Sequence, residues 1–308
     1  MVTNIPPQYY AISARLKEAK SNEEKISVLE EMLAICPKHK GTEKLQKDLK
    51  RKIAKLKREG KRKPKKESIY YLKKEGAGQV VIIGPPSGGK SSLLNALTNA
   101  RVKVSPYPFT TQIPQPGMMP YKNILIQLVD TPPLSKEFSP AWMGAIIREA
   151  DGLLIVFDLS KDEVENEIQE IQEILDSWQL KKKKSILVGN KIDLEGAKGN
   201  FEKLKSQFKI RAISCLNGFG LEELKKEIFN LLEIIRVYAK PPNKEVDLTQ
   251  PFILKSGASL LELAIKINPN FATNFKYAKL FKKGLKKPLI VGKDYLFQDE
   301  DVVEIHFY

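Results

Sequence analysis

The sequence predicts an α/β protein whose central domain contains a doubly wound, mainly parallel sheet. Two observations support this prediction. Short apolar runs alternate with amphipathic stretches between residues 77 and 238, and a glycine-rich loop follows the first apolar run. Strands of a parallel sheet are apolar because helices cover both faces. Composition divides the chain into a basic helical region with a linker (1–75), the α/β domain (76–240) and a small β-grasp fold (241–308).

The N-terminal region is predicted to form a helical hairpin. Ser21 and Glu24 have the spacing of a capping box at the start of the first helix, and Pro37 ends that helix. The second helix is expected to begin near Thr42 and to precede a charged linker at residues 60–66. It carries a narrow apolar stripe in a basic surround, formed by Leu45, Leu49, Ile53 and Leu56.

Most of the excess positive charge lies in one short segment. The chain has a formal net charge of +15, and residues 38–66 contain 15 Lys and Arg against three acids, or +12. Such a segment attracts polyanions and releases counterions on binding them. We therefore expect it to bind the ribosome or ribosomal RNA, with a solvated helix without a partner as the alternative. It lacks the bulky apolar face of a membrane-binding helix, so no membrane partner is expected.

The chain shows no sign of export or of a disulfide framework. No apolar run is long enough to span a bilayer, and the first ten residues lack the layout of a secretory signal. The only cysteines are Cys36 and Cys215. These observations predict a cytoplasmic protein.

The central domain is expected to alternate strands with helices. The predicted strands are Gln79–Ile83, Ile124–Val129, Leu153–Asp158, Ser185–Val188 and Ile210–Ile213. The predicted helices are Ser91–Asn99, Glu163–Trp178, Phe201–Phe208 and Leu221–Val237. Ligands of such sheets bind at the carboxyl ends of the strands, so the loops that follow the strands should carry the chemistry.

The first of these loops matches the phosphate-binding pattern G-x-x-x-x-G-K-[ST]. It consists of Gly84, Pro85, Pro86, Ser87, Gly88, Gly89, Lys90 and Ser91, and Ser92 continues into the helix. Its backbone N–H groups and the N-terminus of the helix would bind phosphates. Lys90 would reach the β- and γ-phosphates as a catalytic residue, and the Ser91 hydroxyl would ligate Mg²⁺. The loop alone does not distinguish ATP from GTP.

Two later loops complete a guanine-nucleotide site. Asp130 ends a predicted strand, where a carboxylate can hold a water of the Mg²⁺ shell. Asn190, Lys191 and Asp193 follow another strand as N-K-x-D. The Asp193 carboxylate can accept hydrogen bonds from guanine N1–H and the exocyclic amine, a donor pair that adenine lacks. Asn190 would brace the base and the phosphate loop, and the Lys191 stem would cover the ring. The expected last element, with a backbone N–H near guanine O6, is Ser214, Cys215 and Leu216.

Between the phosphate loop and Asp130 lies Tyr107-Pro108-Phe109-Thr110-Thr111. GTPases need a threonine in this segment, whose hydroxyl and carbonyl sense Mg²⁺ and the γ-phosphate. We assign Thr111 this catalytic and metal-binding role, with Thr110 as the second candidate.

The C-terminal region changes pattern after Pro241-Pro242. A strand at Phe252–Leu254, a helix at about Ser259–Ile267 and strands near Leu289–Val291 and Val302–Phe307 fit a β-grasp fold.

Taken together, these residues resemble the Obg-like P-loop GTPases, most closely the DRG (developmentally regulated GTP-binding) branch, which ends in a TGS domain. The resemblance covers nearly the whole chain. It rests on residues 84–95, Tyr107–Thr111, Pro116–Met119, Ile126–Pro132, Lys40–Glu43, Asn274–Ala278 and Asp299–Val303. It implies Mg²⁺-dependent binding of GTP and GDP, hydrolysis of GTP as a regulatory switch on the ribosome or RNA, and a TGS domain that docks or binds a protein regulator.

The sequence departs from the family pattern at four places. Pro133 replaces the glycine of D-x-x-G, and Leu134 stands where many GTPases have a water-positioning glutamine. We therefore expect slow turnover, on the order of 10⁻⁴ to 10⁻² s⁻¹, with a GTP-sensing adaptor of negligible hydrolysis as the alternative. The stretch from Pro133 to Asn190 is too short for the domain that the DRG branch usually carries there. Ser87 replaces the asparagine that some relatives use with K⁺, which leaves a K⁺ requirement open.

Overall fold

The computed structural model describes residues 6–18, 22–37, 42–61, 72–98, 113–271, 274–282 and 287–308. The chain forms two compact units, Met1–Ile69 and Tyr70–Tyr308, which are considered separately. Among the described helices, none is both long and apolar enough to cross a bilayer.

The described residues of the N-terminal unit form three helices rather than the predicted hairpin: α1 (Pro7–Glu18), α2 (Asn22–Ile35) and α3 (Glu43–Lys61). The sequence missed α1, although Pro7 is favourable at a first helical position because its φ is already helical. Tyr9 of α1 lies in the core with residues of α2 and α3. The apolar stripe of α3 belongs to the same core, with Leu49 and Ile53 buried in it and Leu45 and Leu56 packed against it. The core residues are Tyr9, Val28, Leu29, Met32, Leu49 and Ile53.

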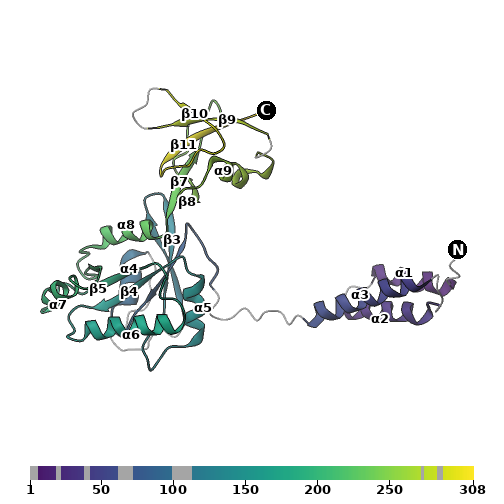
Figure 1. The fold of residues 1–308 in the computed structure, drawn as a ribbon, viewed down its shortest axis with the longest axis horizontal. Coiled ribbons are helices and arrows are strands. Elements are labelled where there is room, and N and C mark those ends of the chain that lie inside the picture. Colours follow the sequence, from purple (N-terminus) through teal and green to yellow (C-terminus); the bar gives the residue numbers. More distant parts are fainter. Residues whose placement is uncertain are drawn as a thin grey trace. The chain divides into compact units, whose positions relative to one another are not determined.

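The central sheet has six strands in the order β2-β3-β1-β4-β5-β6. Only β2 runs antiparallel to its neighbour, and the other pairs are parallel. This confirms the predicted α/β fold with a mainly parallel sheet (Figure 1). The strands are β1 (Gln79–Ile83), β2 (Gln115–Tyr121), β3 (Ile124–Asp130), β4 (Gly152–Asp158), β5 (Ser185–Asn190) and β6 (Ile210–Ala212).

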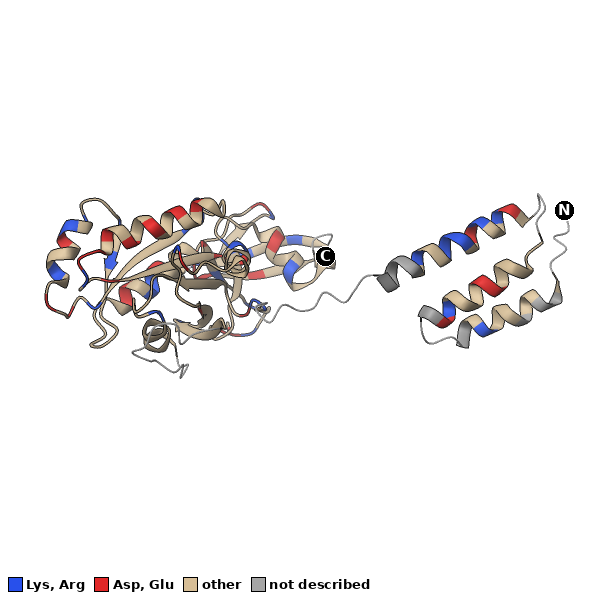
Figure 2. Ribbon diagram, turned by 90° about the horizontal axis from the view of Figure 1, so that it is seen from below, with Lys and Arg blue, Asp and Glu red and all other residues tan. Residues whose placement is uncertain are grey.

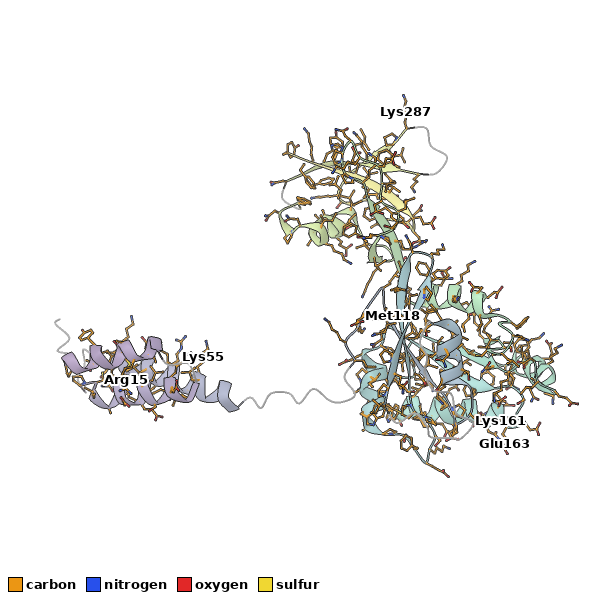
Figure 3. The ribbon with its side chains drawn as sticks, turned by 180° about the vertical axis from the view of Figure 1, so that it is seen from behind. Arg15, Lys55, Met118, Lys161, Glu163 and Lys287 are labelled. Atoms are coloured by element: carbon orange, nitrogen blue, oxygen red, sulfur yellow. The ribbon has the colours of Figure 1, made fainter. Side chains whose placement is uncertain are left out.

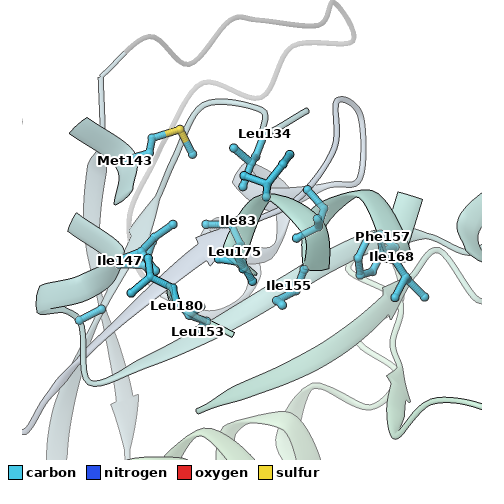
Figure 4. Packing of buried hydrophobic residues seen from close by; sticks show 14 of the residues in the cluster. Ile83, Leu134, Met143, Ile147, Leu153, Ile155, Phe157, Ile168, Leu175 and Leu180 are labelled. Carbon is cyan, nitrogen blue, oxygen red and sulfur yellow. The ribbon is translucent and has the colours of Figure 1, made fainter. Parts of the chain in front are cut away.

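Helices cover both faces of this sheet. Alternate residues of β1 point to opposite sides: Val81 and Ile83 pack with α5 and α6, whereas Val80 and Ile82 pack with α4 and α8. Figure 4 shows the first of these two cores. The helices are α4 (Lys90–Leu97), α5 (Ala141–Glu149), α6 (Val164–Ser177), α7 (Ala197–Leu204) and α8 (Leu221–Leu231). Of these, α5 was not predicted, and α7 begins and ends about four residues before the helix predicted at Phe201–Phe208.

The C-terminal sheet has five strands in the order β10-β9-β11-β7-β8, with α9 packed against one face. The predicted helix Leu221–Val237 is wrong beyond Leu231, because residues 234–239 form β7, which pairs with β8 and β11. The boundary placed at 240–241 therefore falls after the first strand of this sheet. The elements are β7 (Ile234–Ala239), β8 (Phe252–Lys255), α9 (Leu260–Ile267), η2 (Pro269–Phe271), β9 (Phe275–Phe281), β10 (Leu289–Val291) and β11 (Asp301–Phe307).

The two sheets of this unit meet at the turn between β2 and β3. Asn123 in that turn accepts a hydrogen bond from Arg236 Nη1 of β7 at 3.0 Å. The Asn123 amide donates to the Tyr238 hydroxyl at 2.6 Å and to the Leu248 carbonyl at 2.8 Å. The turn thus lies at the end of the β2–β3 hairpin that is opposite Asp130, and it is bonded to the first strand of the C-terminal sheet.

Candidate functional site

The phosphate loop connects β1 to α4, as the sequence predicted. Gly89 caps α4 with a φ of 93°, a conformation that favours glycine. A Cβ atom at Gly89 would also collide with the side-chain amide of Asn190. The backbone at Gly89 therefore lies close to Asn190 at the end of β5. Lys90 and Ser91 are the first residues of α4, at the end of the helix where the phosphates are expected.

The Lys90 side chain is buried, with 6% of its surface exposed. Its ammonium donates to the carbonyl oxygens of Gly84 at 3.0 Å and Pro85 at 2.8 Å. Burial lowers the pKa of Lys90 to about 8, although the nearby carboxylates of Asp130 and Glu167 act in the opposite direction. The amine is thus held at the start of the loop, in a place where added negative charge would restore its ordinary pKa.

Ser91 and Asp130 lie together at the carboxyl edge of the sheet. The Ser91 hydroxyl donates to Asp130 Oδ2 at 2.5 Å, and the Asp130 side chain is fully buried at the end of β3. A hydroxyl and a carboxylate are the hard oxygen ligands that Mg²⁺ prefers. The donor set therefore fits a magnesium ion, with these two residues as its protein ligands or as holders of its waters.

The segment after Asp130 folds back against the phosphate loop. The Thr131 hydroxyl donates to the Ile82 carbonyl at 2.7 Å, and the Leu134 N–H donates to the Gly84 carbonyl at 2.9 Å. Pro133 has no N–H to offer. The Leu134 side chain is completely buried in the core that α5 and α6 cover, in the same cluster as Met143 (Figure 4). In this arrangement the side chain at the usual glutamine position lies in the core and not in the site.

Asn190 joins three loops. Its side-chain Nδ2 donates to the Gly88 carbonyl at 3.2 Å, and its Oδ1 accepts the Cys215 N–H at 3.2 Å. Ser214 is fully buried, and its hydroxyl accepts the Leu216 N–H at 3.3 Å. Burial raises the pKa of the Cys215 thiol to about 12, so this thiol stays protonated. The structure thus brings the phosphate loop, the N-K-x-D loop and the Ser214-Cys215-Leu216 loop together.

The N-K-x-D loop carries an exposed carboxylate. Asp193 is exposed, and within the described part of the chain no group donates a hydrogen bond to it. Lys191 has a φ of 64°, and its ammonium forms an ion pair with Asp158 at 2.6 Å. Burial would raise the pKa of Asp158, but the hydrogen bonds from Lys191 and Ser160 outweigh it and hold the pKa below its usual range. Asp158 therefore anchors the Lys191 stem.

The sequence analysis did not identify three residues that lie at this edge of the sheet. Two further residues that it did assign to the site lie outside the described part of the chain. Asp158 ends β4 as Asp130 ends β3, which is a signal that could have been used. Lys161 and Glu167, in the loop after β4 and on α6, have no motif to mark them. Thr110 and Thr111 lie outside the described residues. The remaining phosphate-loop residues occupy the predicted loop; Ser87, with a φ of 63°, is exposed, and Ser92 lies in the first turn of α4.

The pKa of Lys90 predicts that nucleotide binding takes up a proton. At pH 8 about half of the free protein carries a neutral Lys90, and phosphates should raise its pKa, so GDP binding should take up about half a proton there. Since the free protein holds fewer protons than the complex above pH 8, affinity should fall as pH rises. Calorimetry in two buffers with different ionisation enthalpies measures the uptake.

The same titration at pH 6.5 is the internal control, because Lys90 is already protonated there and uptake should vanish. Lys90→Arg should show no uptake at either pH, since its guanidinium stays charged. A heat of binding that does not depend on the buffer at pH 8 to 9 would contradict the assignment of Lys90 to the phosphates.

Comparisons with known proteins agree with this geometry. A family model described as "50S ribosome-binding GTPase" matches residues 79–191, and a TGS domain model matches residues 235–307. An uncharacterized GTP-binding protein of Methanocaldococcus jannaschii is 28% identical over 92% of each chain. Developmentally-regulated G-protein 2 of Arabidopsis thaliana is 26% identical, covering 92% of this chain and 90% of its own. GTPase Obg of Mycoplasmopsis synoviae is 32% identical over 74% of this chain and 60% of its own.

The alignment with the M. jannaschii protein extends over 360 positions, which is more than the 308 residues of this chain. That relative therefore has residues, within the aligned region, that lie opposite gaps in this chain. The phosphate loop and the N-K-x-D loop meet at one edge of the central sheet. The GTPase model matches the part of the chain that forms this sheet, and the TGS model matches the part that forms the C-terminal sheet. The chain thus combines a GTPase domain with a C-terminal TGS domain, and over 92% of its length it is similar to GTP-binding proteins that include the DRG type.

Proposed function

We propose that this GTPase is a slow regulatory switch that acts on the ribosome or on RNA. The observation that carries the proposal is the basic, exposed face of α3, in a chain whose nucleotide site has a buried leucine at the usual position of the water-positioning glutamine. The N-terminal unit supplies affinity for polyanions, the central domain changes state with its nucleotide, and the TGS domain docks or binds a protein regulator.

The basic face of α3 is separate from its apolar stripe. Lys44, Lys47, Arg51 and Lys55 recur every three or four residues and are exposed, which places them along one side of the helix, opposite the buried Leu49 and Ile53. Figure 2 shows the Lys and Arg residues along α3, and Lys55 is labelled in Figure 3. Four cations in a line over about 16 Å can contact successive phosphates of one strand. The rest of the predicted basic segment, residues 38–41 and 62–66, lies outside the described residues.

The hydrolysis step is the attack of water on the γ-phosphate of GTP. The phosphate-loop amides and Lys90 stabilise the charge that develops on the phosphoryl oxygens. Bound at Ser91 and Asp130, Mg²⁺ would supply further positive charge next to the phosphates. Leu134 takes the usual position of the water-positioning glutamine and is buried, so the side chain at this position does not orient the water. This supports slow unassisted turnover.

The buried Leu134 also favours a second candidate, a GTP-sensing adaptor with negligible hydrolysis. A single-turnover assay with and without ribosomes separates the two. Stimulation by ribosomes supports the switch, and a rate that never exceeds that of Lys90→Ala supports the adaptor.

Neutralising the basic face of α3 should weaken RNA binding and its dependence on salt. We expect the quadruple variant Lys44→Gln, Lys47→Gln, Arg51→Gln and Lys55→Gln to bind a short fluorescent RNA duplex with a salt slope shallower by about 3. The side chains are exposed, so the fold should be retained. Fluorescence anisotropy between low and physiological salt measures the slope, and sedimentation with ribosomes tests the larger target.

The matched control removes four exposed charges from the central domain: Lys181→Gln, Lys182→Gln, Lys203→Gln and Lys209→Gln. It changes the net charge equally and should leave the slope nearly unchanged. If both quadruple variants lose affinity to the same extent, only the overall charge matters, and α3 is not the RNA-binding element.

A further inference from the structure

Two lysines, from different parts of the chain, line the start of the phosphate loop. Lys90 donates to the carbonyls of Gly84 and Pro85 at 3.0 and 2.8 Å, and Lys161 donates to the next carbonyl, that of Pro86, at 3.5 Å. Lys161 comes from the loop between β4 and α6, so no phosphate-loop motif includes it. Figure 3 labels it beside Glu163, just before α6. The carbonyl row from Gly84 to Pro86 thus has an ammonium group at each end.

Lys161 forms an ion pair with Glu167, and only one carboxylate oxygen of Glu167 takes part in it. Its ammonium donates to Glu167 Oε1 at 2.6 Å. The second oxygen, Oε2, is buried and has no hydrogen-bond partner among the described residues. The side chains of Lys161 and Glu167 are 36% and 19% exposed. The Lys161 ammonium thus stays partly accessible to solvent, where a stronger anion can take it from Glu167.

The position of Lys161 points to the γ-phosphate. The loop amides and the N-terminus of α4 bind the α- and β-phosphates, whereas the phosphate-loop lysine reaches the β- and γ-phosphates. The charges of both Lys161 and Glu167 affect the pKa of Lys90, which means that they lie near its ammonium group. Lys161 is therefore on the side of the loop where GTP and GDP differ.

We propose that Lys161 is a second phosphate-binding lysine of this GTPase, which leaves Glu167 to contact the γ-phosphate of GTP and returns to Glu167 when only GDP is bound. The contact is a charge-assisted hydrogen bond to a group with more negative charge than one carboxylate. In the GDP state, the ion pair with Glu167 keeps the Lys161 ammonium near the site and compensates its charge. The inference rests on GTP hydrolysis at this loop, and the Lys90 variant below tests that separately.

In the hydrolysis step, the oxygen of water forms a bond to the γ-phosphorus while the bond from that phosphorus to the bridging oxygen breaks. The electron pair of the broken bond stays on the β-phosphate of GDP, and one proton of the water goes to the released phosphate. Lys161 keeps its own proton throughout. Its charge lies next to oxygens that become more negative in the transition state, which is the role of an arginine finger supplied in cis.

The test compares three variants in two measurements. Lys161→Met keeps the stem and removes the charge, Lys161→Arg restores it, and Glu167→Gln removes the competing acid. The measurements are the single-turnover rate of GTP hydrolysis and the dissociation constants for GDP and a non-hydrolysable GTP analogue. Lys181→Met, at the opposite end of the sheet, is the matched control.

We expect Lys161→Met to lower the rate about 10-fold or more and to raise the dissociation constant of the GTP analogue about 10-fold, with less than a 2-fold change for GDP. Lys161→Arg should recover most of the rate. Glu167→Gln should tighten binding of the GTP analogue relative to GDP, which a merely structural role of the ion pair would not do. Lys181→Met should behave as the wild type.

Equal losses of GDP and GTP-analogue affinity in Lys161→Met would overturn the proposal, because they would show a general electrostatic effect. A rate and affinities unchanged from the wild type would overturn it as well. A Lys90→Ala protein that still hydrolyses GTP at the wild-type rate would instead show that hydrolysis does not occur at this loop, which is a failure of the proposed function and not of Lys161 alone.

Discussion

Replacing Asp193 with Asn should lower the affinity for GTP by about 100-fold or more and create a preference for XTP. The carboxylate accepts two donors of guanine, N1–H and the exocyclic amine, and hydrogen bonds to a charged group are among the stronger ones. An asparagine amide would place a donor against the guanine amine. Xanthine has a carbonyl oxygen at that position, so the same amide would complement it.

The structure makes this test clean, because Asp193 is exposed and no described residue donates a hydrogen bond to it. Its replacement removes no hydrogen bond of the described residues, whereas Asn190 could not be changed without separating Gly88 from Cys215. Glu195→Gln is the matched control, since it removes an exposed acid from the same loop. Calorimetric competition among GTP, GDP, ATP and XTP gives the readout. Equal binding of ATP by the wild type, or no change in the variant, would refute the base-reading role of Asp193.

The nucleotide site was predictable because its chemistry is tied to local sequence. A phosphate loop needs its glycines and lysine at fixed spacing, and Asp130 and Asn190 follow apolar strands whose carboxyl ends share one edge of the sheet. Lys161 is different. It reaches the loop only because β4 lies beside β1 in the sheet, and that pairing comes from tertiary structure. No spacing rule within the sequence could identify it.

The end of helix α8 was predicted wrongly for a different reason. The apolar pattern of α8 continues beyond Leu231 without a glycine or a proline, so the sequence predicts one long helix to Val237. The break occurs at Glu233, which adopts a φ of 49°. A non-glycine residue in this conformation is uncommon and carries no sequence signal. The β-branched residues Ile234, Ile235 and Val237 favour a strand, but only pairing with β8 and β11 decides it.

The second large effect is expected at Arg236, whose replacement by Met should destabilise the C-terminal domain by about 2–3 kcal/mol, less than for a fully buried pair because Asp299 and Glu300 are partly exposed. Arg236 is 2% exposed. Its guanidinium donates to both oxygens of Asp299, at 3.1 and 2.7 Å, to Glu300 at 2.6 Å and to Asn123 at 3.0 Å. Burial raises the pKa of Asp299, but the hydrogen bonds from Arg236 outweigh it and leave the pKa below its usual range. Without Arg236, the partly buried carboxylate of Asp299 loses its main cation.

Hydrogen exchange of β7 and β11 measures this effect in the domain where it arises, and the calorimetric melting profile gives its size. Arg236→Lys should recover only part of the loss, because an ammonium cannot bridge both carboxylates and Asn123 with a planar fork. Arg211→Met is the control: Arg211 also pairs with an acid, Glu227, but the two side chains are 42% and 30% exposed, so its loss should cost less than about 1 kcal/mol. Equal destabilisation by the two Met variants would contradict the buried network.

The consequence for function follows from the position of Asn123. This residue lies in the turn between β2 and β3, and β3 ends at Asp130, which lies beside Ser91 in the nucleotide site. The Arg236–Asn123 hydrogen bond therefore connects the TGS domain to a hairpin that leads directly to the expected metal ligands. If the hairpin transmits the nucleotide state, the difference in exchange of β7 between the GDP and GTP-analogue complexes should be reduced in Asn123→Ala, which keeps the Arg236–Asp299 pair. An undiminished difference would show that the TGS domain senses the nucleotide by another route.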